Sequence, residues 1–268
     1  MKKPLLPAAQ LLATCFVALV LSVSARADES ALGAGAAANY TSGKYGSKTT
    51  TSITSLPFFL SYNTDDWTVK LTVPYLIVAG GTGVVPGVGA TVNTNPKGRG
   101  RHGAGSMAMG LGDITSALSY DAYFNEEARF GVDLTGKVKF GTANRDQGLG
   151  TGQNDYTAEV DLFKAFDGLS LLADAAYTSL GSSPYIRLKS GVASGSLGGS
   201  YKLSERASLG LSVNASGAVS AASGASRDVT ASAGWKLAPQ WRLQAYVLKG
   251  SGAGGPDFGG GASINGTF

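Results

Sequence analysis

Apolar and polar residues alternate along segments of about ten residues over much of this chain, and turn-forming residues separate the segments. The clearest segment is 129–140, whose even positions are Phe, Val, Leu, Gly, Val and Phe, whereas four of its six odd positions are charged. The alternation recurs in 207–219, 228–237 and 241–247. Because successive side chains of a strand point to opposite faces of a sheet, this pattern predicts strands with one apolar and one polar face.

The connections between these strands alternate in length along the chain. Short connections are expected at 63–66, 125–127, 167–168, 204–205 and 238–240, and longer ones at 79–107, 142–154, 181–184, 220–225 and 251–256. Outer-membrane barrels have short turns at the periplasmic end and longer loops at the extracellular end. The series therefore predicts an all-β, antiparallel, up-and-down transmembrane β-barrel of about twelve strands, with a weak first strand at 34–45.

Aromatic residues are spaced along the strands as a membrane requires. All three tryptophans, Trp67, Trp235 and Trp241, adjoin predicted short turns, and Phe140 follows Phe130 on the same face ten residues later. At ~3.3 Å per residue and a strand tilt of roughly 40°, that spacing covers about 25 Å of membrane. Two aromatic girdles around a lipid-facing band explain this better than the core of a soluble sandwich or lipocalin.

The chain begins with the pattern of a secretory signal peptide. Lys2 and Lys3 precede an apolar run at 11–23, and the small residues Ala25 and Ala27 fit a cleavage site. We expect residues 1–27 to be removed, which leaves 28–268 as a single barrel domain in the bacterial outer membrane. The last strand ends on Phe268, which we expect the outer-membrane assembly machinery to recognise together with the preceding amphipathic residues.

Removal of the signal peptide changes the charge and the cysteine content. Lys2, Lys3 and Arg26 leave with it, so 19 of the 22 basic residues remain against 18 acidic ones. A nearly neutral chain without a basic stripe argues against nucleic-acid binding. Cys15, the only cysteine, lies in the removed segment, where lipidation is the alternative to a plain apolar role. The mature chain therefore has no cysteine for a disulfide or a thiolate metal site.

The polar faces of the strands define the lining of the predicted lumen. The charged residues expected there are Lys70, Asp113, Asp121, Arg129, Asp133, Lys137, Lys139, Glu159, Asp161, Asp174, Arg187, Lys189, Asp228, Lys236 and Arg242. Such charges need partners or water, so a wet channel or ion pairs are expected, with weak ion selectivity because both signs occur. Lys137 and Lys139 are expected to pair across strands with Glu159 and Asp161, the alternative being a role in solute binding.

Three stretches of the sequence carry a resemblance to a known family. They are the strand that contains Pro57, the segment WTVKLTVPY at 67–75, and GLGDI at 110–114. In these stretches and in their order, the chain resembles the outer-membrane MetA-pathway, phenol-degradation transporter family over essentially the whole mature length. The resemblance implies a barrel of about twelve strands that admits small, often aromatic or hydrophobic compounds. Gly110, Gly112 and Asp113 form the family-like motif, although glycines that let a strand bend beside a lumen-facing aspartate would also explain it.

The function expected from these observations is passive passage of small solutes through a narrow lumen, since eight strands leave room only for side chains and 16 to 18 leave an aqueous channel. The long connection 79–107 carries Lys97, Arg99, Arg101 and His102. We expect it to be a surface loop that meets lipid headgroups, the alternative being a constriction folded into the barrel.

Two other functions compete with the channel. A hydrolase would need a histidine that is oriented by acidic and nucleophilic partners, and the single histidine, His102, lies in a glycine-rich loop rather than on a rigid strand. We therefore expect neither catalysis nor a cofactor. A structural or adhesive barrel that conducts nothing remains an alternative. The expected partners are outer-membrane lipid, the assembly machinery and small-molecule solutes.

Overall fold

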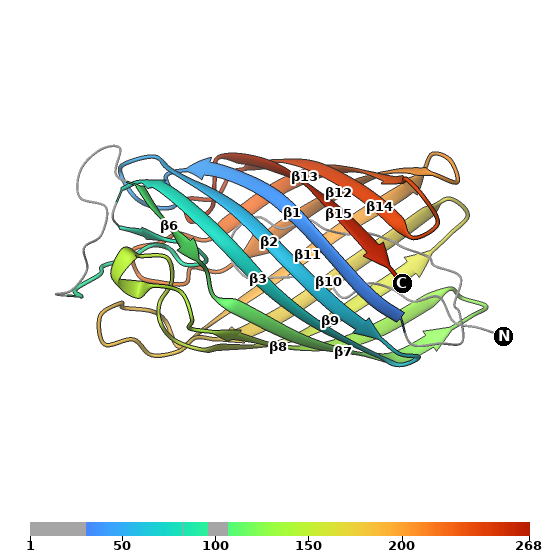
Figure 1. The fold of residues 1–268 in the computed structure, drawn as a ribbon, viewed down its shortest axis with the longest axis horizontal. Helices are drawn as coiled ribbons and strands as arrows, with labels where there is room; N and C mark the ends of the chain where they lie inside the picture. The colour runs from blue at the N-terminus through green and yellow to red at the C-terminus, as the bar shows by residue number, and fades with distance from the viewer. Residues whose placement is uncertain (1–30, 82, 96–106) are drawn as a thin grey trace.

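Twelve long strands form one closed antiparallel barrel, in which the first strand pairs with the last (Figure 1). The computed structural model describes residues 31–81, 83–95 and 107–268, so the predicted signal peptide and the residues Lys97, Arg99, Arg101 and His102 lie outside the described part. In chain order the strands are β1 (Ala31–Gly43), β2 (Thr51–Asn63), β3 (Trp67–Gly80), β7 (Ile114–Asn125), β8 (Phe130–Phe140), β9 (Asp155–Ala165), β10 (Leu169–Ser179), β11 (Gly191–Lys202), β12 (Ala207–Ser216), β13 (Ser226–Lys236), β14 (Trp241–Gly250) and β15 (Phe258–Thr267). The predicted fold class and strand number are confirmed.

Shorter elements lie at the long-loop end of the barrel. Strands β4 (Val84–Val85) and β5 (Gly89–Ala90) form a small hairpin, and β6 (Met107–Leu111) pairs with the second half of β3. A single 3₁₀ turn, η1 (Arg145–Gln147), lies in the connection between β8 and β9. In the described part of the chain, no helix is long and apolar enough to cross a membrane.

The outer surface carries the apolar faces of the strands. Along β8, Leu134 is exposed whereas its neighbours Asp133 and Thr135 are buried, as expected when one face meets lipid and the other lines the interior. Exposed tryptophan and tyrosine side chains gather near the short-turn end, where the rings of Trp67 and Tyr120 lie 4.4 Å apart. The alternation therefore places its apolar residues on the outer surface of the barrel.

The two ends of the barrel sequence meet at the short-turn end. The backbone N–H of Leu32 donates to Phe268 O at 3.0 Å, and the ring of Phe268 meets Trp241 edge-on at 5.6 Å. At the turn between β11 and β12, a hydrogen bond from Lys202 and the charge of that ammonium hold the pKa of the exposed Glu205 carboxyl below its usual range. Closure of β1 on β15 leaves the barrel without a free edge at this seam.

Candidate functional site: the barrel lumen

The interior of the barrel has one charged wall and one wall of small residues. Strands β7 to β10 present seven of the fifteen predicted lumen charges on their inner faces. The inner faces of β11, β12, β13 and β15 instead carry short polar residues and glycines, namely Ser194, Ser196, Gly198, Ser200, Ser208, Gly210, Ser212, Asn214, Thr230, Ser232, Gly234, Gly259, Gly261, Ser263 and Asn265. Between β13 and β15, strand β14 turns the larger side chains Gln244, Tyr246 and Leu248 inward. Because serine and glycine occupy little volume, a cavity of about 60 Å³ lies beside the small residues of β11 and β12.

A fully buried ion pair crosses the charged wall between β8 and β9. Lys137 Nζ lies 2.6 Å from Glu159 Oε2, and the two side chains are 2% and 0% exposed. In the register of these strands Lys137 faces Thr157 and Glu159 faces Thr135, so the pair is diagonal. This confirms the cross-strand pairing expected for Lys137.

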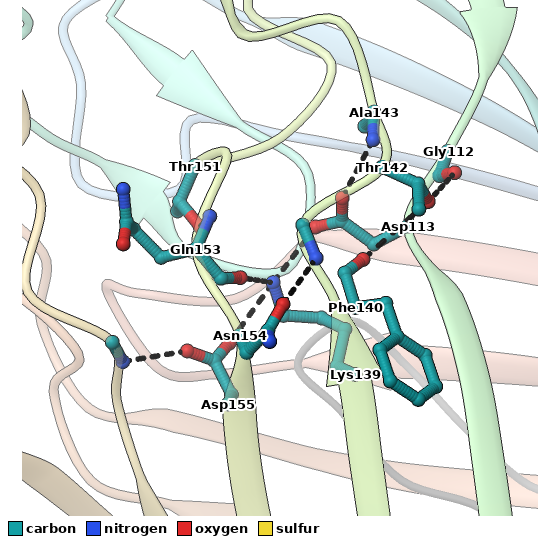
Figure 2. A network of polar contacts seen from close by, with 12 residues as sticks. Gly112, Asp113, Lys139, Phe140, Thr142, Ala143, Thr151, Gln153, Asn154 and Asp155 are labelled. Atoms are coloured by element: carbon teal, nitrogen blue, oxygen red, sulfur yellow. Dashed lines mark hydrogen bonds and ion pairs between the residues drawn. The ribbon is translucent and has the colours of Figure 1, made fainter.

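Lys139 joins three chain segments at the long-loop end of the charged wall (Figure 2). Its ammonium lies 2.7 Å from Asp113 Oδ2 and 3.0 Å from Asp155 Oδ2, and it also donates to Gln153 O at 3.2 Å. The second oxygen of Asp113 accepts from the backbone N–H of Ala143 at 2.9 Å. From the sequence, Lys139 is expected to pair with Glu159 or Asp161. It pairs with neither, because the register places Lys139 directly opposite Asp155.

This network lies where the barrel wall is interrupted. Strand β3 pairs with β7 along its first half and with β6 along its second half, and the chain leaves the ladder between Leu111 and Ile114. A Cβ on Gly112 would come within 2.8 Å of the Leu76 side chain, so a larger residue at this bend would require Leu76 to shift. The ladder between β7 and β8 ends at Ile114 and Phe140, and β6 pairs only with β3 among the described strands. The glycine motif therefore marks a break in the wall, with Asp113 pointing inward to Lys139.

Four aspartates stand side by side across the charged wall. Asp121 of β7 faces Asp133 of β8, Asp133 faces Asp161 of β9, and Asp161 faces Asp174 of β10. We refer to these four residues as the carboxylate row. Ser196 of β11 is opposite Asp174 and donates a hydrogen bond to it. The strand register thus brings like charges together that are far apart in the sequence.

The polar ladder continues from the carboxylate row onto the wall of small residues. Asn214 of β12 is opposite Ser196, and Asp228 of β13 is opposite Asn214. Asp228 is buried, and its Oδ1 accepts from Asn214 Nδ2 at 2.6 Å and from Thr230 Oγ1 at 3.0 Å. A cavity of about 60 Å³ adjoins Ser196, Asn214 and Asp228.

Three predicted lumen residues lie elsewhere. Arg129 adopts a positive φ of 48° in the turn before β8 and pairs with the exposed Asp167 at 2.8 Å, because the chain reverses there instead of continuing the strand. Arg187 and Lys189 are exposed in the connection between β10 and β11. The connection continues until β11 begins at Gly191, so these two residues are not part of a strand. Its apolar residue Ile186 is buried in the apolar cluster with Val85 and Val219. The lumen placement expected for these three residues is wrong.

The remaining predicted residues line the interior or its rim. Lys70 of β3 places its ammonium 4.2 Å from the ring centre of Phe59 on β2. Lys236 is the last residue of β13 and is exposed, and it faces Arg242 near the beginning of β14. These two basic residues therefore lie at the short-turn rim, whereas Lys70 lies deeper.

Loop residues form an apolar cap in the long-loop mouth of the barrel. The β4–β5 hairpin inserts Val84 and Val85, which are 0% and 1% exposed. Val84 packs with Tyr45, Ile53, Leu76, Val78, Ala143 and Leu149, and Val85 packs with Val88, Ile186, Val192 and Val219. Burial of two valines contributes on the order of 3 kcal/mol. The surface position expected for 79–107 is therefore wrong for 84–91, which pack into the mouth, whereas Val92, Asn93 and Thr94 are exposed.

Sequence reasoning missed Asp155 and the cap. Asp155 lies two residues before Thr157 and four before Glu159, so extending the same alternation by one step would have found it. Val84 and Val85 are adjacent branched apolar residues in a loop that otherwise consists largely of Gly, Thr and Asn. Such a pair in a polar loop is a signal of burial, although it does not reveal the packing partners.

Comparison with known proteins places the fold. No family model matches the chain, and no curated protein matches it in sequence. Among solved structures, the COG4313 outer membrane channel from Pseudomonas putida F1 is similar with a TM-score of 0.65 at 16% identity, covering 93% of this chain and 99% of that one. The chain has the fold of an outer-membrane β-barrel. The KdgM porin is also similar, with a TM-score of 0.53 at 10% identity and coverage of 88% and 99%.

Proposed function

We propose that this protein is an outer-membrane channel for the passive passage of small solutes. The observation that carries the proposal is the division of the interior into a charged wall and a wall of serine and glycine. Charged groups such as the carboxylate row are costly to enclose without water, and the small residues opposite them leave room for it. The similarity to the Pseudomonas putida channel and to the KdgM porin supports the same conclusion at the level of the fold.

The passage in this proposal is narrow. Twelve strands lie between the eight that leave room only for side chains and the 16 to 18 of open porins. The apolar cap around Val84 and Val85 closes the long-loop end further. Solutes of low mass therefore fit the proposal, and movement of the cap is required for entry from that end.

For the solute class we propose small compounds that include aromatic or hydrophobic ones. The resemblance to the MetA-pathway, phenol-degradation family motivates this assignment. The interruption of the wall between β6 and β8 also supports it, because Met107, Met109 and Leu111 are exposed on the outer face of β6 beside it. A neutral hydrophobic solute can move between lipid and lumen there, and the adjoining Lys139 network holds the ends of the flanking segments in place.

The cap also favours one alternative, a barrel that serves as a structural or adhesive protein and conducts nothing. Two apolar clusters fill the mouth, and a permanently closed mouth suits that function. His102 lies outside the described residues, so the hydrolase alternative gains no support from geometry.

Solute entry into liposomes tests both the channel and the solute class. Vesicles with the refolded protein are diluted into isotonic phenol or into an aliphatic alcohol of similar mass, and swelling is followed by light scattering against protein-free vesicles. We expect protein-dependent swelling with both solutes and a faster rate for phenol. Equal rates would contradict the preference for aromatic compounds and leave a general channel, whereas rates equal to those of protein-free vesicles would contradict the channel itself.

A further inference from the structure

The carboxylate row concentrates negative charge at one level of the lumen. Neighbouring strands are ~4.8 Å apart, so the four aspartates follow one another over about 14 Å of the wall. Like charges directly opposite each other on neighbouring strands destabilise a sheet. A sequence that keeps four of them in register must therefore be compensated by protons or by cations.

The lysines of β8 do not neutralise Asp133, Asp161 or Asp174. Lys137 is bound by Glu159, and Lys139 is bound by Asp113 and Asp155. Among the described residues, no ion pair reaches Asp133, Asp161 or Asp174, which receive at most hydroxyl donors. The lysines of β8 are thus bound by other carboxylates, and Asp133, Asp161 and Asp174 are left to protons or to cations that enter the lumen.

Two buried oxygen atoms, one in the carboxylate row and one beside it, point to a ligand. Glu159 is 3% exposed and faces the interior two residues before Asp161 on β9; its Oε2 binds Lys137, whereas Oε1 has no hydrogen-bond partner in the described structure. Asp174 accepts a hydrogen bond from Ser196 through Oδ2. Its other oxygen, Oδ1, is buried and has no hydrogen-bond partner in the described structure. Both atoms are acceptors, so the missing group is a hydrogen-bond donor or a cation.

The spacing of the row selects the kind of cation. No group of three or more acidic, histidine or cysteine residues in the described part of the chain is arranged to hold a metal ion, because these carboxylates are spread along the wall. An ammonium group differs from a metal ion in that it needs only one carboxylate and neighbouring acceptors. A short-chain diamine can place its two ammonium groups on two neighbouring carboxylates, and the row ends beside the cavity next to Ser196 and Asp228.

We propose that the carboxylate row, with Glu159 beside it, binds small organic ammonium ions and makes the lumen selective for cations. The proposal rests on the proposed function, since it assumes that the lumen conducts. In this proposal positively charged amines pass through the lumen along the carboxylate row. The neutral compounds proposed above pass through the break in the wall between β6 and β8.

The test measures reversal potentials of the full refolded barrel in planar bilayers under a KCl gradient. We expect potassium to be favoured over chloride by at least about threefold, as for pores lined by one sign of charge. The double variant D133N/D161N should bring the ratio close to one and weaken current block by putrescine at least about threefold. The matched control is D167N, which removes an exposed aspartate of a short turn and should leave both quantities unchanged.

A second measurement needs no substitution. Acidification of the wild-type bilayer from about pH 7 to about pH 3 protonates carboxylates and should abolish the preference for potassium. A wild-type ratio at or below one, or a ratio and putrescine block that D133N/D161N leaves unchanged, would overturn the proposal. Absence of any conductance would instead contradict the proposed channel function, so the two failures are distinguishable.

Discussion

The ion pair between Lys137 and Glu159 should be the interaction in the charged wall that tolerates substitution least. Replacing Lys137 by methionine keeps most of the side-chain volume but leaves a carboxylate that is 0% exposed without its cation. Breaking a buried pair by removing one partner costs about 3–5 kcal/mol. K137M should therefore lower the unfolding free energy by that amount, which corresponds to a change of roughly 100-fold or more in the unfolding equilibrium.

A second pair in the same barrel provides the matched control. Arg129 and Asp167 are 2.8 Å apart, close to the 2.6 Å of the buried pair, but their side chains are 57% and 98% exposed. Exposed pairs contribute at most about 1 kcal/mol, so R129M should change the stability little. The double variant K137M/E159M should recover most of the loss, because it removes the uncompensated charge.

The assay is reversible unfolding by guanidinium in lipid vesicles, followed by tryptophan fluorescence, for the wild type and the three variants. Equal effects of K137M and R129M would refute the argument that burial decides the strength of these pairs. Failure of the double variant to recover stability would show that packing rather than the unpaired charge causes the loss.

Three further predictions concern the Lys139 network, the cap and the last strand. K139M deprives Asp113 and Asp155 of their ion partner, so the unfolding free energy should fall by about 3 kcal/mol and limited proteolysis should cleave 142–154 faster; unchanged cleavage would contradict it. V84D places a carboxylate in an apolar cluster, and it should detach the cap and speed liposome swelling, whereas an unaltered rate would mean that the cap does not limit entry. F268A should reduce the amount of heat-modifiable barrel in bacterial membranes while refolding in detergent stays near wild type, and equal membrane yields would argue against recognition of Phe268.

Alternation in the sequence was sufficient to predict which face of the clearest strands turns outward. Alternation of side chains is a local property of extended chain, so the inward position of Asp133 or Glu159 follows from a few neighbouring residues. The lengths of the connections likewise predicted at which end of the barrel each connection lies, because short and long connections alternate along the chain. These local signals failed where the chain leaves the strands, as at Arg129, which lies in a turn, and at Ile186, which joins the cap.

The contacts inside the lumen required the register between strands. A shift of two residues between β8 and β9 would preserve every inward-facing side chain and yet place Asp133 opposite a different residue than Asp161. Alternation alone therefore could not predict the carboxylate row or the ion pair between Lys139 and Asp155. The packing of the cap could not be predicted because it brings together loop residues, such as Val85 and Ile186, that no periodicity connects.

Single-channel recording tests the central claim, that the barrel conducts, most directly. The full refolded protein is added to a planar bilayer beside the V84D variant, and a heat-denatured sample serves as the control. The account predicts small, reproducible conductance steps for the wild type and larger or longer openings for V84D, because the apolar cap restricts the mouth. Folded protein that inserts but remains silent in both forms would contradict a channel and favour a structural barrel.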